Sequence, residues 1–155
     1  MTTSARVSIQ GAPFDTAAEI ARLSQALHGR AGAIVTFSGL CRDEGRRLTA
    51  LELEHYPGMA EAEIDRVVAE AQGRWPLQGV RVIHRHGLVA PGDGIVLVIT
   101  ASAHRIAAFE AASFLMDYLK TRAPFWKREH LADGTIGGWV EASAADDAAA
   151  GRWEG

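Results

Sequence analysis

Residues 95–103 read "IVLVITASA", a continuous apolar run of strand length that leads directly into a helical pattern from Arg105 to about Thr121. A run of this kind is typical of a strand in the core of a sheet, and "PGDG" at 91–94 marks the turn before it. The helical pattern predicts one inner stripe, made of Ile106, Phe109, Ser113, Met116 and Leu119. A buried strand followed by a long helix indicates that helices pack against a sheet.

The rest of the chain continues this alternation of strands and helices. The further predicted strands are 6–10, 32–39, 48–56, 80–89, 125–131 and 135–142, and 32–39 is expected to be buried. The further predicted helices are 14–29, which Asp15 or Thr16 would cap, and 59–75. The pattern indicates one α/β or α+β domain over residues 1–143, with a mixed or antiparallel sheet and about three helices. An Ala- and Asp-rich tail at 144–155 is expected to be loosely ordered.

Composition and charge limit the classes of function. The 155 residues suit one domain, and 16 Lys and Arg against 19 Asp and Glu give a formal charge of −3. A general nucleic-acid binder gains affinity through a net basic face, so any anion site here must be local. Cys41 is the only cysteine, which excludes a disulfide framework and favours a reducing compartment. Since we find no signal peptide and no apolar run of membrane-spanning length, we expect a cytoplasmic protein without a membrane partner.

Cationic side chains stand at the ends of two predicted elements. Arg42 follows the strand 32–39, where on its own it is most simply a surface arginine. His104 and Arg105 stand at the start of the long helix, where the helix dipole disfavours cations and a bound phosphate or carboxylate would remove the conflict. The alternative is that Ser102 caps the helix while both side chains face water.

The stretch "KTRAPFWKREH" at 120–130 carries the third cationic group. Lys120 closes the long helix, where the dipole favours a cation, so its default role is electrostatic. Strand alternation divides the following residues into two faces: Phe125, Lys127 and Glu129 on one, and Trp126, Arg128 and His130 on the other. Aromatic neighbours would desolvate Lys127 and favour its free amine as nucleophile or base. The plainer interpretation is a lysine on an exposed strand.

Other catalytic and metal-binding patterns are not found in the sequence. The glycines of "GLVAPGDG" at 87–94 lack the GK[ST] ending of a phosphate loop, and the six histidines lack HExxH spacing. His84 and His86 share a strand face without an obvious third ligand, so we interpret them as a core or surface pair. We expect neither a metal nor a cofactor.

Five segments taken together resemble one known family. They are "FSGLCR" at 37–42, "LELEHYPGMAEAEI" at 51–64, "RWPLQGVRVIHRHG" at 74–87, "SAHRIAAFEA" at 102–111 and "MDYLKTRAPFWKRE" at 116–129. In this order, and over nearly the whole chain, they resemble the large, catalytic subunit of molybdopterin synthase. The last segment is the most specific of the five.

The resemblance implies an α/β hammerhead-type fold that forms a homodimer. Each subunit would receive a small ubiquitin-like sulfur-carrier subunit, which gives a heterotetramer. The Gly-Gly C-terminus of the carrier, activated as a thiocarboxylate, would enter the pocket and supply sulfur. The implied substrate is cyclic pyranopterin monophosphate, called precursor Z, which receives two sulfurs to become the dithiolene of molybdopterin in molybdenum cofactor biosynthesis.

The resemblance also implies which residues act. Lys120 and Lys127 would be catalytic. The implied substrate-binding residues are Leu40, Cys41, Arg42, His104, Arg105, Lys120, Lys127, Arg128 and Glu129, with no metal ligand among them. Because sulfur arrives on the carrier, the enzyme needs no cysteine of its own. Lys, Arg and His side chains suffice to hold a phosphate, stabilise oxyanions and move protons.

The sequence also departs from the family pattern and leaves other functions open. Cys41 stands where relatives often have Val, and Ser143 stands where many carry a basic residue that reaches the neighbouring subunit's pocket. Either this contact between subunits is absent here, or Arg152 or Arg46 replaces that residue. One alternative is a non-catalytic adaptor that only binds a ubiquitin-like tail. Another is a single-stranded RNA binder that uses the aromatic and basic side chains of 120–130.

Overall fold

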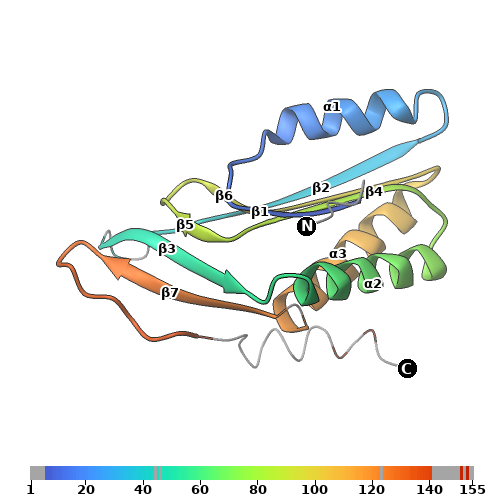
Figure 1. The fold of residues 1–155 in the computed structure, drawn as a ribbon. Coiled ribbons are helices and arrows are strands. Elements are labelled where there is room, and N and C mark those ends of the chain that lie inside the picture. The colour runs from blue at the N-terminus through green and yellow to red at the C-terminus, as the bar shows by residue number, and fades with distance from the viewer. Residues whose placement is uncertain are drawn as a thin grey trace.

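The computed structural model describes residues 6–43, 45, 47–122, 124–140, 151 and 153. Within these residues the chain forms two sheets and three helices (Figure 1). The elements in chain order are β1 (Val7–Gln10), α1 (Thr16–Ala26), β2 (Ala33–Leu40), β3 (Leu48–His55), α2 (Met59–Arg74), β4 (Leu77–Arg85), β5 (Gly87–Val89), β6 (Gly94–Ser102), α3 (Arg105–Thr121) and β7 (Phe125–Leu131). The predicted α/β class is confirmed.

The larger sheet has four strands in the order β1-β4-β6-β2. β1 pairs with β4 in parallel, and β6 runs antiparallel to both β4 and β2. Figure 1 shows α1 over one face of this sheet and α2 and α3 over the other. The central position of β6 explains its apolar sequence, because each of its residues from Val96 to Ser102 is buried.

The smaller sheet has three antiparallel strands in the order β5-β3-β7. The predicted strand 80–89 divides into β4 and β5, and the break falls beside Gly87, whose φ of +83° favours glycine. Leu53 and Val89 point into a small core with Cys41, whereas Glu54 is exposed, so the predicted alternation is confirmed. The predicted strand 135–142 is wrong for 135–140, which make only isolated bridges to β7 at Ile136 and Val140; residues 141 and 142 lie outside the described part.

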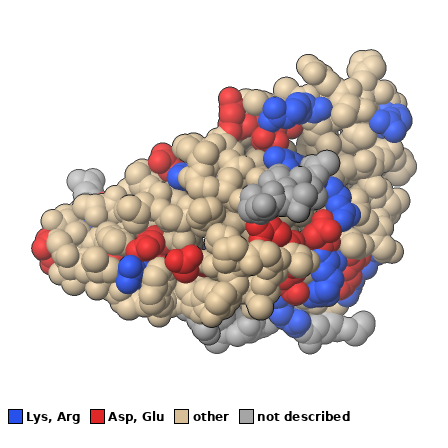
Figure 2. Space-filling model, in the orientation of Figure 1, with Lys and Arg blue, Asp and Glu red and all other residues tan. Residues whose placement is uncertain are grey.

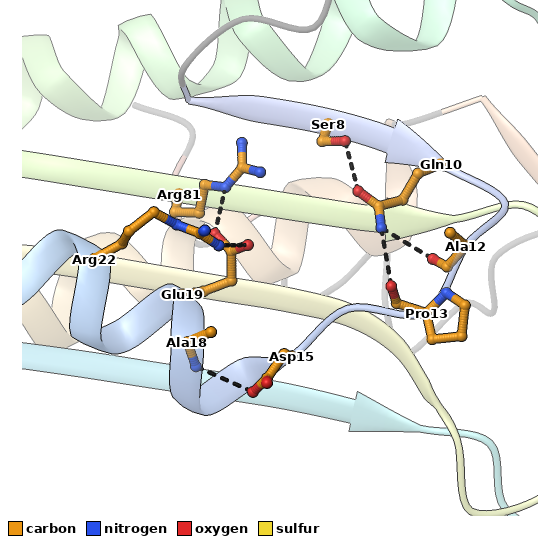
Figure 3. A network of polar contacts seen from close by, with 9 residues as sticks. All are labelled: Ser8, Gln10, Ala12, Pro13, Asp15, Ala18, Glu19, Arg22 and Arg81. Atoms are coloured by element: carbon orange, nitrogen blue, oxygen red, sulfur yellow. Dashed lines mark hydrogen bonds and ion pairs between the residues drawn. The ribbon is translucent and has the colours of Figure 1, made fainter.

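Polar contacts fix α1 on the larger sheet (Figure 3). Asp15 caps the helix, as predicted, by accepting a hydrogen bond of 3.1 Å from the Ala18 amide. The Glu19 carboxylate accepts a hydrogen bond of 2.9 Å from Arg81 on β4 and also pairs with Arg22. Glu19 thus links one turn of α1 directly to a central strand.

The main core lies between the larger sheet and helices α2 and α3. α2 buries Ile64, Val67, Val68 and Ala71, which confirms its predicted apolar face, while the fully buried ring of Phe114 on α3 lies edge-on to Trp75. Trp153 packs against the same two rings, and its indole donates a hydrogen bond of 2.5 Å to Asp117. Apart from Trp153 and Gly151, residues 144–155 lie outside the described part, and so does the predicted loose order of the tail.

Two burial predictions are wrong. The predicted inner stripe of α3 faces outward at Ile106 and Phe109, which are 65% and 61% exposed. Leu119 of the predicted stripe is buried, as expected. The other buried residues of α3 lie beside the predicted stripe and are Ala108, Ala111, Ala112, Phe114, Leu115 and Tyr118. β2 is also less buried than expected because it is an edge strand, and Phe37 is 41% exposed. None of the described helices is long and apolar enough to cross a membrane.

Candidate active site

The strand topology brings three chain segments together at one end of the larger sheet. Leu40, the last residue of β2, pairs with Gly94, the first residue of β6, and His84 near the end of β4 pairs with Val96. We call this end of the sheet, where β2 and β4 end and β6 begins, the lysine end. The name reflects α3, which runs back along the sheet and carries Lys120 in its last turn. The smaller sheet adjoins the same end (Figure 1).

The loop after β2 is held by its backbone at the lysine end. The Cys41 amide donates a hydrogen bond of 2.8 Å to the Asp93 carbonyl, and the Cys41 carbonyl accepts one of 2.7 Å from Gly92. Burial raises the pKa of the Cys41 thiol, and the carboxylates of Asp93, Asp43 and Glu129 add to this effect. A buried thiol with a raised pKa is a poor nucleophile, so the Cys41 side chain is not suited to sulfur chemistry.

The two neighbours of Cys41 in the predicted site both face solvent. Leu40 is 59% exposed and Arg42 is also exposed. Leu131 of β7 packs against the same small core as Cys41, so β7 lies near this loop. The loop and β7 therefore border the same region of the lysine end.

β7 carries Lys127 and Glu129 on one face. Lys127 pairs with Leu53 of β3, and its backbone exchanges hydrogen bonds of 3.1 and 2.7 Å with Val140. Both side chains are exposed, so the aromatic surroundings expected for Lys127 are not supplied by the described part of this chain. Lys120 and Lys127 are the only two lysines in the sequence, and both belong to elements that meet at the lysine end.

Arg128 lies on the opposite face of β7, as the alternation predicted. Its Nε donates a hydrogen bond of 2.8 Å to Glu52 on β3, and its guanidinium lies over the Trp139 ring at 4.3 Å. His130 Nε2 lies 2.8 Å from the same Glu52 oxygen. These two partners, His130 first, lower the pKa of the Glu52 carboxyl. Arg128 is thus firmly oriented, but away from the face of Lys127.

Aromatic rings connect the lysine end to the smaller sheet. Phe125, the first residue of β7, stacks on His84 with ring centroids 3.7 Å apart and lies 5.8 Å from His55 at the end of β3. Burial lowers the pKa of His84 to about 4, and the positive charge of Lys120 acts in the same direction. Lys120, in the last turn of α3, precedes Phe125 by five residues, so the end of that helix lies near the stack of Phe125 on His84.

His104 and Arg105 lie at the other end of α3. Fifteen residue steps separate Arg105 from Lys120, and a rise of 1.5 Å per residue puts them about 22 Å apart along the axis. One chain therefore does not bring His104 and Arg105 together with Lys120 around one small anion. The alternative had two parts. The Ser102 cap is wrong, since its hydroxyl donates to the Pro76 carbonyl at 2.9 Å while His104 occupies the cap position. His104 and Arg105 are both exposed in this chain, as that alternative expected.

Sequence reasoning missed the residues that support the predicted site. Glu52 and His130 orient Arg128, and His55 brings a third imidazole beside His84 and His86. The only available signal was the pairing of β3 with β7, which aligns Glu52 with Arg128. Among the described residues no group of three or more His, Cys, Asp and Glu is arranged to hold a metal ion.

Comparison with known proteins decides the family. The family model described as "MoaE protein" matches residues 9–122. The chain belongs to the MoaE family. A protein of Mesorhizobium japonicum named "Molybdopterin synthase catalytic subunit" is 69% identical to this MoaE chain over 150 residues, which are 96% of the chain and 92% of the relative.

Solved structures of MoaE proteins share this fold. The MoaE protein from Burkholderia ambifaria is 47% identical with a TM-score of 0.80, and the match covers 97% of this chain and 99% of that one. A chain in the crystal structure of molybdopterin synthase from Staphylococcus aureus is 28% identical with a TM-score of 0.75, over 85% of this chain and 94% of that one. The fold that the resemblance implied is thereby confirmed.

Proposed function

We propose that this MoaE family protein is the catalytic subunit of a molybdopterin synthase and acts as a sulfurtransferase in molybdenum cofactor biosynthesis. It transfers sulfur from the thiocarboxylated C-terminus of a small ubiquitin-like carrier subunit to cyclic pyranopterin monophosphate. Each transfer exchanges a carrier sulfur for a substrate oxygen and leaves the carrier as a carboxylate. The observation that carries the proposal is the meeting of the segments with Arg42, Lys120 and Lys127 at the lysine end of a chain 69% identical to a protein of that name.

The chain has a formal net charge of −3, so the positive charge at the lysine end is local. Figure 2 shows acidic and basic side chains side by side on the face in view, with large areas of that face carrying neither. Local cations suit a small phosphate or carboxylate, whereas a nucleic acid requires an extended basic face. This favours a pterin phosphate and a carrier C-terminus as guests over single-stranded RNA.

The complete site requires two copies of the chain. His104 and Arg105 stand about 22 Å from Lys120 along α3, so one chain cannot place them on the same small substrate. Ile106, Phe109, Ser113, Met116 and Lys120 share one side of α3. Two copies packed through this side with their α3 helices antiparallel would bring His104 and Arg105 of one copy beside Lys120 of the other. The exposed rings and methyl groups of Phe109 and Ile106 suit such contact.

The roles of the residues follow from their places. Arg42, with His104 and Arg105 from the second copy, binds the phosphate and pterin, for which guanidinium groups are well suited. Lys120 and Lys127 stabilise oxyanions and move protons as substrate oxygens leave. Leu40 and Cys41 contribute backbone to the pocket and Glu129 lies on the face of Lys127. Arg128, on the other face of β7, contacts the carrier or its tail.

The test is reconstitution with the thiocarboxylated carrier and precursor Z in a reducing, cytoplasm-like buffer, which matches the compartment we propose. Lys127→Ala is expected to abolish most molybdopterin formation while carrier binding persists. The control is Arg66→Ala on α2, whose side chain is 52% exposed and pairs with Glu63. Full activity of Lys127→Ala would refute the role of that lysine. Carrier binding without any conversion by the unsubstituted protein would favour the adaptor alternative.

A further inference from the structure

Three histidines and one phenylalanine form a cluster at the start of β7. His84 stacks on Phe125 with an interplanar angle of 15°, and His55 lies over the same ring at 23°. His86 is next to His55, with ring centroids 4.8 Å apart. His84 and His55 are each only 8% exposed. None of these imidazoles is among the site residues that the family resemblance implies. They also belong to no group of three or more His, Cys, Asp or Glu that could hold a metal ion among the described residues.

The hydrogen bonding of His84 fixes which ring nitrogen carries the proton. Nδ1 lies 2.8 Å from the carbonyl oxygen of Arg85, and a carbonyl oxygen can only accept. Nδ1 must therefore carry the hydrogen, which leaves Nε2 unprotonated in the neutral ring. Among the described residues no hydrogen-bond partner is found for Nε2. Free imidazole more commonly carries its proton on Nε2, so this tautomer is imposed by the backbone of β4.

The surroundings of His84 keep it neutral. Burial lowers its pKa to about 4, although the hydrogen bond to the Arg85 carbonyl raises it. The charges of Lys120 of α3, His55 of β3 and His86 act in the same direction as burial. The facing residue of β7 is Phe125, which carries no charge. At neutral pH the ring is thus a hydrogen-bond acceptor at Nε2 beside the ammonium of Lys120, which has three donors and no acceptor.

We propose that His84 is a positioning residue for Lys120, whose ammonium donates a hydrogen bond to the unprotonated Nε2 of His84 in the working complex. The stack on Phe125 holds the ring in place, and Phe125 in turn begins the strand that carries Lys127. The buried imidazole of His84 would thereby contact both the last turn of α3, through Lys120, and the first residue of β7, through Phe125. Lys120 is exposed in the single chain. The proposed hydrogen bond therefore belongs to the working complex, in which substrate and the second copy cover the lysine end.

The role of His84 in catalysis rests on the proposed function. The interaction between His84 and Lys120 can be tested without an activity assay. Imidazole nitrogen-15 and carbon-13 spectra identify the His84 tautomer and follow its titration. We expect the Nδ1–H tautomer, and we expect Lys120→Met to raise the pKa of His84 because a neighbouring positive charge is removed. Lys127→Met is the matched control, since Lys127 is not among the groups that act on His84. An Nε2–H tautomer, or a His84 titration that Lys120→Met leaves unchanged, would overturn the proposal.

Kinetics then separate positioning from packing. His84→Phe keeps a flat ring against Phe125 but removes the acceptor, whereas His84→Gln retains an acceptor oxygen at a similar reach. Loss of one hydrogen bond to a charged group predicts that His84→Phe lowers kcat roughly 10- to 100-fold with KM little changed. His84→Gln is expected to recover part of this loss. If His84→Phe is as active as His84→Gln or more so, the role is packing alone and the proposal fails.

The outcomes remain distinct from those of the proposed function. If neither Lys120→Ala nor Lys127→Ala reduces molybdopterin formation, the function of the lysines is wrong, yet the spectra still decide whether His84 and Lys120 interact. If His84→Phe does not fold, the tautomer and titration in the unsubstituted protein, with the activity of His84→Gln, decide the proposal. An inactive, folded His84→Gln with the Nε2–H tautomer in the parent protein would contradict it.

Discussion

The outward side of α3 yields a quantitative prediction about dimer formation. Phe109 is 61% exposed in the single chain, although it is one of the larger apolar residues. Full burial of such a side chain contributes about 1.5–3 kcal/mol, so covering the exposed part contributes about 1–2 kcal/mol per copy. A symmetric dimer contains the residue twice. Phe109→Ala is therefore expected to weaken the dimer by about 2–4 kcal/mol, or roughly 30- to 700-fold in dissociation constant.

Sedimentation equilibrium over a range of protein concentrations measures this dissociation constant directly. Leu88→Ala is the matched control, because Leu88 is 58% exposed but lies on β5, away from α3. We expect Leu88→Ala to leave dimerisation unchanged. The contrary result is a Phe109→Ala protein that dimerises as tightly as its parent while Leu88→Ala weakens the dimer. It would show that the second copy does not pack on α3.

Three further predictions concern the described side chains. Because Arg128 and His130 lower the pKa of Glu52, its carboxylate stabilises the fold above the ordinary carboxyl pKa, and this contribution is lost as pH falls through the lowered value. Glu52→Gln should thus reduce the urea midpoint more at about pH 7 than at about pH 3. Phe114→Ala, which empties a fully buried site, should cost about 3–5 kcal/mol in the free energy of unfolding, measured by denaturant titration. The buried Cys41 thiol should react with a chromogenic disulfide reagent only after unfolding; rapid labelling of the native protein would contradict its burial.

The sequence predicted those elements whose local pattern and environment agree. Ile64, Val67 and Val68 lie on one side of α2 and the charged residues lie on the other. The position of α2 and its buried face were therefore both predicted correctly. The prediction failed for α3 because that helix is apolar on two adjacent sides. Ile106 and Phe109 have helical spacing, but so have Ala108, Ala111 and Leu115, and only the packing shows which side meets the sheet.

The candidate site was predictable in its residue types but not in its geometry. Lys120 and Lys127 stand in a distinctive local sequence, whereas the distance from Lys120 to Arg105 depends on the length of α3 and required the helix bounds. The stack of His84 on Phe125 joins positions 41 residues apart, and no local pattern reports such a contact. Interactions between elements were thus the part that the sequence did not reveal.

The account rests on a site shared between two copies, and a mixed dimer tests this most directly. Two tags allow isolation of a dimer with Lys120→Ala in one copy and Arg105→Ala in the other, which leaves one complete site and predicts about half of the unsubstituted activity. A dimer that carries both substitutions in one copy beside an unsubstituted copy has no complete site, so it is expected to be inactive. The reverse result, with the first dimer inactive and the second at about half activity, would show that each site lies within one chain.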